Sequence, residues 1–304
     1  MQRLEPDASG IQRAVELLRS GELVAFPTET VYGLGGDAMN DTAVQAIFKA
    51  KGRPADHPLI VHLPNAESMH DWASNESDRT RQLAEVFWPG PLAMVVNKQA
   101  SVSNLITGGQ DTVGLRVPEH PVAQQLLQAF GGALAAPSAN RFGRISPTTA
   151  EHVLDEFSDA SGVAAVIDGG ACRVGVESTI IDLSVDRPRL LRPGMIAASE
   201  IESVLNQPLT TPDDSEGPRV SGRLESHYAP TTPLHQMAID HIVQTVSQQT
   251  SGLGVIALHA SPEIAVSNHW VFMPLEPVAY ATRLYDELRK MDAMDFEKIL
   301  VEQP

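Results

Sequence analysis

The chain is poor in cysteine and contains no long apolar run. Its single cysteine, Cys172, excludes an internal disulfide framework and fits a reducing compartment. A lone cysteine is more often a small buried residue than a nucleophile, so we expect a structural role for it. No segment approaches the roughly 18 apolar residues of a membrane span, and residues 1–6 lack the apolar stretch of a secretion signal. We therefore expect a cytoplasmic protein without a membrane partner.

Basic residues are also in deficit. The chain has 22 Lys and Arg against 38 Asp and Glu, which gives a formal net charge of −16. Proteins that grip a nucleic-acid backbone usually present a basic surface, so this balance argues against direct, stable nucleic-acid binding. A small anionic ligand stays compatible with it where a few cations converge. The candidate cations lie in segments marked by glycine or proline: Lys51, Arg53, Arg116, Arg141, Arg144 and Arg192.

Familiar ligand-binding motifs are missing as well. No Gly-x-x-x-x-Gly-Lys-Ser/Thr phosphate loop occurs, and Gly33-Leu34-Gly35-Gly36 does not match the dinucleotide-binding fingerprint. The ten histidines show no metal-ligand spacing, so we expect no metal held by protein side chains. A nucleotide would have to be bound by a different arrangement.

The chain does contain a regular alternation of strand-like and helix-like segments. Its 304 residues, 42% of them hydrophobic, suggest about two domains. Up to residue 205, short apolar runs alternate with segments of helical spacing, which predicts an α/β domain on a twisted, mixed sheet. The predicted strands are residues 23–26, 59–63, 93–96, 113–117, 133–136, 164–167 and 179–183, and the predicted helices are residues 11–19, 42–50, 80–86, 121–130, 149–157 and 198–205.

Residues 206–232 interrupt this pattern. They contain four prolines, the acidic cluster Asp213-Asp214-Ser215-Glu216 and almost no apolar periodicity, so they are interpreted as a linker. The aromatic pair His227-Tyr228 is unusual in a linker and suggests that the segment folds back onto the first domain. Residues 233–304 predict a small α/β domain with helices at 238–249 and 279–291 and strands at 254–258, 270–273 and 298–301. No helix follows the last strand, so this domain is expected to lack its final helix.

Residues 26–62 form the densest polar region. After the strand at 23–26, residues 33–36 are interpreted as a glycine-rich turn that lets the backbone approach a ligand closely. Lys51 and Arg53 come just beyond the helix that is expected to end at residue 50. Fixed cations at such a place suit a phosphate or a carboxylate. The region therefore predicts an anion site.

One later strand carries polar residues on a single face. Thr112, Gly114 and Arg116 point to the same side, because side chains alternate along a strand. A functional arginine in a site and a surface arginine on a solvated edge strand are both compatible with this segment.

Further polar residues follow the predicted strands. Ser138 and Asn140 come after an apolar strand, where open α/β sheets bind ligands. Ser146 precedes Pro147 and is predicted to cap a helix N-terminus, which favours an anion, although a capped helix without a ligand would look the same. Glu177 could orient an amine or belong to a structural ion pair.

Together, these segments resemble the threonylcarbamoyl-AMP synthase family in its long form. The matching pieces run in family order over about residues 10–232: Pro27-Thr28-Glu29-Thr30-Val31-Tyr32-Gly33-Leu34, Lys51-Gly52-Arg53-Pro54, Phe87-Trp88-Pro89-Gly90-Pro91, Pro137-Ser138-Ala139-Asn140, Ser146-Pro147-Thr148, Gly175-Val176-Glu177-Ser178-Thr179, Leu191-Arg192-Pro193-Gly194 and His227-Tyr228-Ala229-Pro230. The resemblance implies a YrdC/RibB-like twisted mixed sheet with flanking helices at 1–205, a linker at 206–232 that folds over the active site, and a small Rossmann-like α/β domain at 233–304.

The resemblance also implies a reaction. A nucleotidyltransferase of this family condenses L-threonine, bicarbonate or CO2, and ATP into L-threonylcarbamoyladenylate and pyrophosphate, with Mg2+ carried by the ATP phosphates. The product would pass to a tRNA threonylcarbamoyl transferase that forms N6-threonylcarbamoyladenosine at position 37 of tRNA. Such chemistry requires no protein nucleophile and rests on positioning the reactants and neutralising phosphate charge.

The family's functional residues can be carried over to matching positions. Threonine would be held by Thr30, His62, Arg116, Ala136 and Ser178. ATP would be held by Arg53, His57, Thr112, Ser138, Asn140, Ser146, Arg192 and Tyr228, and the catalytic cations would be Lys51 and Arg53. One position departs from the family pattern, because His57 stands where asparagine is more common.

Two other functions are compatible with the fold that the resemblance implies. An RNA-binding protein without synthase activity is disfavoured by the net charge of −16 and by the lack of aromatic residues among the basic ones. A carbamoyl-transfer role, as in hydrogenase-maturation proteins, would require additional modules that this sequence does not contain.

Overall fold

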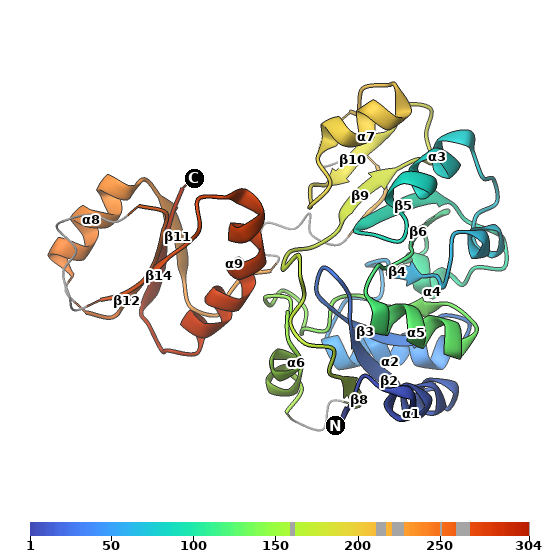
Figure 1. Ribbon diagram of the computed structural model, residues 1–304, viewed down its shortest axis with the longest axis horizontal. Coiled ribbons are helices and arrows are strands. Elements are labelled where there is room, and N and C mark those ends of the chain that lie inside the picture. The colour runs from blue at the N-terminus through green and yellow to red at the C-terminus, as the bar shows by residue number, and fades with distance from the viewer. Residues whose placement is uncertain (159–161, 211–216, 221–227, 250, 260–267, 304) are drawn as a thin grey trace. The chain divides into compact units, whose positions relative to one another are not determined.

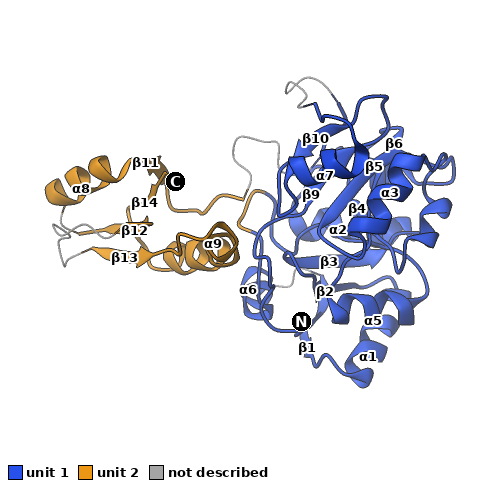
Figure 2. Ribbon diagram, turned by 45° about the horizontal axis from the view of Figure 1, so that its top comes forward, with its two compact units in different colours: residues 1–142, 146–227 blue, residues 143–145, 228–304 orange. Residues whose placement is uncertain are grey.

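The structure is a computed structural model that describes residues 1–158, 162–210, 217–220, 228–249, 251–259 and 268–303. The chain divides into two compact units, residues 1–142 with 146–227 (unit 1) and residues 143–145 with 228–304 (unit 2) (Figure 2). The acidic cluster at 213–216 and His227 lie outside the described residues. The described linker residues 206–210 and 217–220 belong to unit 1.

The described part of unit 1 is built on one mixed sheet of ten strands (Figure 1). The strands lie side by side in the order β1-β8-β2-β3-β7-β4-β6-β5-β9-β10, with both parallel and antiparallel pairs. Their bounds are β1 (Gln2–Leu4), β2 (Leu23–Pro27), β3 (Tyr32–Asp37), β4 (Ile60–His62), β5 (Leu92–Asn97), β6 (Thr112–Arg116), β7 (Leu134–Ala135), β8 (Val163–Ile167), β9 (Thr179–Asp182) and β10 (Arg189–Arg192).

Helices cover both sides of one half of this sheet. Leu23 and Ala25 of β2 pack into a large core that includes residues of α2 (Asp41–Lys51). Val24 and Phe26 pack into a second core with α1 (Ala8–Arg19) and α5 (Pro121–Phe130). A strand buried on both faces needs an uninterrupted apolar sequence, which accounts for the composition of β2. The helices of unit 1 are α1 (Ala8–Arg19), α2 (Asp41–Lys51), η1 (Glu67–Asp71), α3 (Asp78–Phe87), α4 (Asn104–Thr107), α5 (Pro121–Phe130), α6 (Ala150–Glu156) and α7 (Ala198–Leu205).

The other half of the sheet has helices on only one side within the described residues. Leu92, Met94 and Val96 of β5 point into the large core that contains residues of α2, α3 and α7. On the opposite side, Ala93 and Val95 join a small cluster with Ile180 and Leu191 that includes no residue of a described helix. We call this side of β4, β6, β5 and β9 the helix-free face. Side chains on it can contact a ligand, because no helix of the described chain packs there.

The predicted glycine-rich turn is in fact a strand. Residues 33–36 belong to β3, which pairs with β2 in antiparallel fashion. A Cβ atom on Gly35 would lie 2.8 Å from Cε1 of Phe26, so the glycine leaves room for that ring. The prediction was wrong because glycine is uncommon inside strands, so a glycine-rich sequence is usually interpreted as a turn.

Other local predictions are confirmed or corrected by the element bounds. The helices predicted at 121–130 and 198–205 coincide with α5 and α7. Lys51 is the last residue of α2 instead of lying beyond it. β6 lies between β4 and β5, so the edge-strand alternative for Arg116 is wrong. Ser146 does not cap α6, because the cap is Thr149, whose side chain accepts a hydrogen bond from the His152 amide.

The described part of unit 2 contains a second sheet, of four parallel strands in the order β11-β14-β12-β13. Helices α8 and α9 lie on opposite sides of it (Figure 1), as the expected Rossmann-like arrangement requires. Strand β11 was not predicted, because only two residues of its sequence Leu-His-Gln-Met are apolar and three of the four are exposed. The bounds are β11 (Leu234–Met237), α8 (Ile239–Gln248), β12 (Leu253–Ala257), β13 (His269–Phe272), α9 (Pro277–Asp292) and β14 (Lys298–Glu302).

Unit 2 also includes three residues from the middle of the chain, Gly143–Ile145. The Ala229 amide donates a hydrogen bond to the Gly143 carbonyl (3.0 Å), and Arg144 forms a β-bridge with Ala229. The guanidinium group of Arg289 on α9 donates to the Ile145 carbonyl. A short loop between residues of unit 1 is therefore part of unit 2.

Candidate active site

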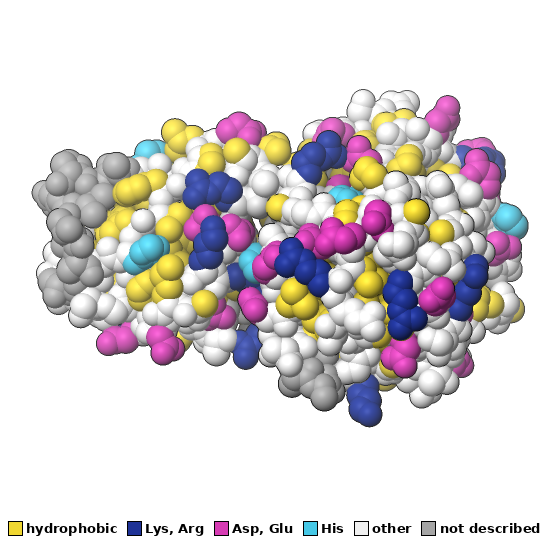
Figure 3. Space-filling model, turned by 60° about the horizontal axis from the view of Figure 1, so that its bottom comes forward, with side chains coloured by type: hydrophobic (Ala, Val, Ile, Leu, Met, Phe, Trp, Pro, Cys, Tyr) yellow, Lys and Arg dark blue, Asp and Glu magenta, His cyan; other side chains and the backbone are white. Residues whose placement is uncertain are grey.

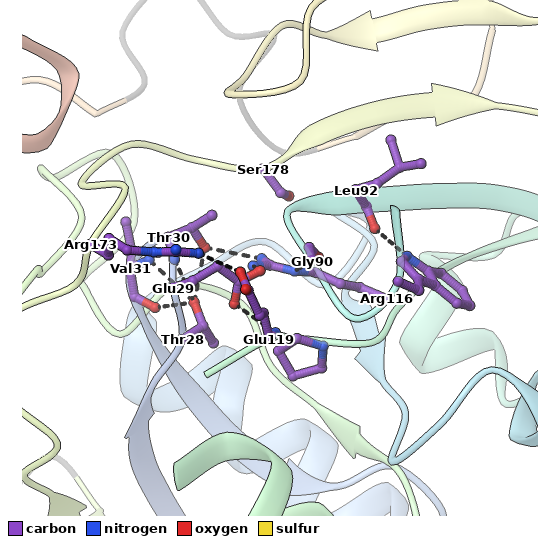
Figure 4. Close-up of polar contacts among 12 residues, drawn as sticks. Thr28, Glu29, Thr30, Val31, Gly90, Leu92, Arg116, Glu119, Arg173 and Ser178 are labelled. Carbon is purple, nitrogen blue, oxygen red and sulfur yellow. Dashed lines mark hydrogen bonds and ion pairs between the residues drawn. The ribbon is translucent and has the colours of Figure 1, made fainter. Parts of the chain in front are cut away.

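Arg116 and the loop after β2 form a buried polar cluster at one end of the helix-free face. The guanidinium group of Arg116 donates three hydrogen bonds: from Nη1 to Thr30 Oγ1 (3.0 Å), from Nη2 to Glu29 Oε1 (2.7 Å) and from Nε to the Gly90 carbonyl (3.3 Å). Figure 4 shows Glu29 and Thr30 reaching Arg116, with Ser178 on the segment that leads into β9. Arg116 is only 4% exposed, so its charge needs a partner in the protein.

The loop after β2 is held in place by Thr28. The Thr28 hydroxyl donates to the Val31 carbonyl (2.6 Å) and accepts a hydrogen bond from the Val31 amide (3.2 Å). Such a hydroxyl closes a tight turn by replacing backbone partners. It fixes the two intervening residues, Glu29 and Thr30, so that both side chains reach Arg116.

Glu29 balances the charge of Arg116. Burial raises the pKa of Glu29, but the charge and hydrogen bond of Arg116, together with the backbone amides of Glu29 and Glu119, hold the pKa below its usual value. The second carboxylate oxygen accepts a hydrogen bond from the Glu119 amide (3.0 Å). The carboxylate therefore stays ionised at neutral pH. Sequence reasoning missed this residue, because its partner is 87 positions away and no local pattern links the two.

His62 lies on the same side of the sheet, at the end of β4. Burial, and after it the charge of Arg116, lowers the pKa of His62 to about 3. Its ring packs edge-on against Phe26, with ring centres 6.1 Å apart. The imidazole is therefore neutral at physiological pH, and can hydrogen-bond a ligand but cannot hold an additional proton.

Ser178 belongs to a network with Arg192 and Ser146, which were both expected to bind the nucleotide, and with Glu177. Arg192 donates from Nη2 to Ser178 Oγ (2.9 Å) and from Nε to the Ser178 carbonyl (3.0 Å). The same guanidinium group lies 3.5 Å from a carboxylate oxygen of Glu177, whose other oxygen accepts a hydrogen bond from the Ser146 hydroxyl (2.7 Å). Of the two roles left open for Glu177, the ion pair is the one present here.

Lys51 supports the loop that follows β7. Its ammonium group donates to the carbonyls of Ser138 (2.6 Å) and Asn140. Burial, and after it the nearby charge of Arg53, lowers the pKa of Lys51 to about 7. The amide of Ala136 at the start of this loop donates to the Ile60 carbonyl (3.0 Å), so a backbone contribution from Ala136 to a ligand would use its carbonyl.

Arg53 is also buried and bound to backbone carbonyls. It donates from Nη2 to Pro58 (2.9 Å) and from Nε to His57 (3.4 Å). The His57 ring packs edge-on against Phe142, 5.2 Å between centres, and Arg53 lies over the same phenyl ring. Burial, followed by the charge of Arg53, lowers the pKa of His57. In this chain the histidine at the unusual position is thus a neutral side chain that packs on Phe142.

The remaining predicted residues lie in three places. Thr112 begins β6 and shares the helix-free face with Arg116. Asn140 donates from Nδ2 to the Arg141 carbonyl (2.8 Å). Tyr228 belongs to unit 2, where its ring centre is 6.0 Å from that of Tyr285.

Some chemistry is disfavoured by the surroundings of the side chains. Cys172 is buried, and burial raises the pKa of its thiol, so it stays protonated and is unsuited to nucleophilic attack. Within the described residues, no group of three or more His, Cys, Asp and Glu is arranged to hold a metal ion. No helix of the described chain has the length and apolar character to cross a membrane.

Known proteins match both parts of the chain. Residues 16–194 match the Sua5/YciO/YrdC family model, described as telomere recombination, and residues 196–304 match the C-terminal domain of threonylcarbamoyl-AMP synthase. The chain belongs to the threonylcarbamoyl-AMP synthase family. It is 39% identical to a threonylcarbamoyl-AMP synthase of Bacillus subtilis and 38% identical to one of Pyrococcus abyssi, over 96% of this chain and 87% and 88% of the relatives' lengths.

A solved structure agrees with the fold. The crystal structure of P. abyssi Sua5 complexed with L-threonine superposes with a TM-score of 0.90 at 36% identity, over 100% of this chain and 92% of that one. The predicted fold class and the family resemblance are confirmed by this likeness and by the family matches.

Proposed function

We propose that the chain is a threonylcarbamoyl-AMP synthase, which condenses L-threonine, bicarbonate or CO2, and ATP into L-threonylcarbamoyladenylate and pyrophosphate. The observation that carries the proposal is the charge-balanced cluster of Arg116, Glu29 and Thr30 in a chain of this family. A buried guanidinium group with a fixed orientation can bind the carboxylate of an amino acid, and the adjacent hydroxyl can bind a second polar group of it.

The chemistry divides into two steps. The threonine amine, once deprotonated, attacks the carbon of CO2 and loses a proton to form a carbamate. With bicarbonate, a C–O bond also breaks and a water molecule leaves. A carbamate oxygen then attacks the α-phosphorus of ATP, and the bond to the β-phosphate oxygen breaks and releases pyrophosphate. Neither step forms a bond to a protein atom, in keeping with the buried, protonated Cys172. The protein contributes alignment of the reactants and stabilisation of the negative charge on the phosphates.

The residue roles follow this division. Threonine is bound by Thr30, His62, Arg116, Ser178 and the carbonyl of Ala136. The nucleotide is bound by Arg53, His57, Thr112, Ser138, Asn140, Ser146, Arg192 and Tyr228, and Lys51 and Arg53 stabilise the developing phosphate charge. Mg2+ arrives with ATP as part of the substrate. A phosphate next to Lys51 favours its charged form, which burial alone disfavours.

The product has an activated acyl phosphate bond and would be consumed by a transfer reaction. We propose that it passes to a tRNA threonylcarbamoyl transferase that modifies adenosine 37. In this scheme the synthase itself does not need to bind tRNA.

The test is a measurement of pyrophosphate released by purified protein with L-threonine, bicarbonate, ATP and Mg2+. Release should depend on threonine, and mass spectrometry should detect threonylcarbamoyladenylate. Arg173→Ala is a suitable control, because the Arg173 side chain is 72% exposed and pairs with Glu119 at the surface. Folded protein that releases no pyrophosphate in response to threonine would contradict the proposal.

A further inference from the structure

The helix-free face contains a small cavity next to residues that were expected to bind ATP. Its floor is apolar and comprises Ile60, Ala93, Val95 and Ile180, and Val220 covers it. Free space amounts to about 20 Å³, enough for about one water molecule. We call residues 217–220 the strap. The strap lies over this cavity, whose apolar floor would suit a flat apolar group.

The strap is held by a two-way pairing with Gln110 at the rim of this cavity. Gln110 Nε2 donates to the Arg219 carbonyl (3.2 Å), and the Arg219 amide donates to Gln110 Oε1 (2.7 Å). Nε2 also donates to the Thr107 carbonyl (3.2 Å). This additional bond fixes the orientation of the side-chain amide, because a flip would place Oε1 against another carbonyl oxygen.

A fixed amide of this kind distinguishes between purine bases. Adenine presents a donor, its amino group, next to a ring-nitrogen acceptor, and this pair matches the oxygen and NH2 of a glutamine. Hypoxanthine has a carbonyl oxygen at position 6 and a protonated N1, so donor and acceptor are exchanged. Gln110 would then face an acceptor with its oxygen and a donor with its NH2 group.

The cavity has the right position for the base of the nucleotide. Pro58 lines it, and the Pro58 carbonyl accepts a hydrogen bond from Arg53. Thr112 and Gly114 line it as well, and Arg116 lies further along the same face of β6. Four residues of strand span about 13 Å between Thr112 and Arg116. An adenylate along β6 would have its base near Thr112 and its acyl group near Arg116.

We propose that Gln110 recognises the adenine base of ATP and that the peptide group of Arg219 takes the place of the base when no nucleotide is bound. This inference rests on the proposed function for the identity of the nucleotide. The strap is then an internal competitor. The Arg219 side chain holds the strap in place through a hydrogen bond to the Gly108 carbonyl (2.7 Å) and an ion pair with Asp56 (3.8 Å). The apparent affinity for ATP is lower in proportion to the fraction of molecules in which the strap is docked.

The first test compares ATP with inosine triphosphate in unaltered protein and in Gln110→Glu. We expect the unaltered protein to prefer ATP at least tenfold in kcat/KM. Gln110→Glu should lower that preference at least tenfold, because the carboxylate offers no donor to the ring acceptor of adenine but accepts the N1 proton of hypoxanthine. Gln99→Glu is the matched control, since the Gln99 amide donates to the His70 carbonyl away from the cavity, and its preference should be unchanged.

Isothermal titration calorimetry without threonine measures the affinities for ATP and inosine triphosphate, so it gives the nucleotide preference independently of turnover. An unaltered ATP preference in folded Gln110→Glu, or no preference in the unaltered protein, would overturn the role of Gln110. If ATP binds with the expected selectivity but no pyrophosphate is released, the proposed reaction fails while the base recognition stands.

The second test concerns the strap. Arg219→Ala removes the two contacts of the Arg219 side chain and leaves Gln110 intact. The KM for ATP should therefore fall, while the preference for ATP over inosine triphosphate stays the same. A higher KM for ATP would mean that the strap belongs to the bound state, and would overturn its role as a competitor.

Discussion

At the scale of single residues, the site depends on how a buried positive charge is balanced. Arg116 and Glu29 are 4% and 3% exposed in their side chains, and a carboxylate oxygen lies 2.7 Å from the guanidinium nitrogen. Removing one member of a buried pair leaves the other without a counter-charge, which commonly costs about 3–5 kcal/mol. Glu29 therefore fixes the orientation of Arg116 and also makes its burial tolerable.

Glu29→Gln should lower the free energy of unfolding at pH 7 by about 3–5 kcal/mol in urea titrations. The pKa of Glu29 is lower in the folded protein than in the unfolded chain, so its stabilisation is present above the unfolded value of about 4.5 and disappears as the pH falls through the folded value. The difference between the two proteins should therefore narrow below pH 4.5. A constant difference at all pH values would contradict this account.

Glu119→Gln is the matched control. The Glu119 side chain is 47% exposed and pairs with Arg173 at the surface, where an ion pair contributes about 0–1 kcal/mol. The backbone amide that Glu119 donates to Glu29 is unchanged by this substitution.

At the scale of elements, apolar periodicity predicted the strands of the sheet interior well and the glycine-rich or polar ones poorly. β2 is apolar throughout because both of its faces are buried, and it was predicted within one residue of its bounds. β3 was missed because its glycines accommodate the Phe26 ring, a contact between strands that a local pattern does not record. For the site, period two placed Thr112 and Arg116 on one face of β6, whereas Glu29 and Gln110 acquire their partners only through the fold.

Another glycine fixes the start of β9. A Cβ atom on Gly194 would lie 2.4 Å from the Thr179 amide nitrogen and 2.7 Å from the Glu177 carbonyl oxygen. Gly194→Ala should displace this backbone, which carries Ser178, and destabilise the protein by about 1–3 kcal/mol, as overpacking commonly does. The KM for threonine should rise in the pyrophosphate assay.

Gly33→Ala is the comparison for this prediction. A Cβ atom there would meet the Ala136 Cβ and the Phe26 ring at 3.5 Å, an ordinary van der Waals distance. Melting temperature and threonine KM should change little. Equal effects of the two substitutions would show that close backbone approach at Gly194 is not the cause.

At the scale of the whole molecule, the charge balance argues against nucleic-acid binding. The formal net charge is −16, and on the face in Figure 3 the Lys and Arg side chains are dispersed among acidic and uncharged ones. Cations that are buried in the site, such as Lys51 and Arg53, are not available to a phosphate backbone at the surface. The buried cations therefore do not contribute to a basic surface.

We expect no binding of unmodified tRNA at micromolar concentrations and 150 mM salt in fluorescence anisotropy, because backbone binding requires several exposed cations. A measurement at about 20 mM salt serves as the sensitive control, since electrostatic binding strengthens as salt falls. Tight binding at 150 mM salt would contradict the expectation and revive the RNA-binding alternative.

The three-residue loop Gly143–Ile145 has a consequence for the order of events during translation. Its partners are Ala229 and Arg289, and the Arg289 contact spans 144 positions of the chain. N-terminal segments generally fold while synthesis continues, but this loop has to wait until α9 has left the ribosome. Asn140 and Ser146, on either side of the loop, are thus joined by a segment that acquires its final partners late. The loop between Asn140 and Ser146 therefore reaches its final form only after α9 has been synthesised.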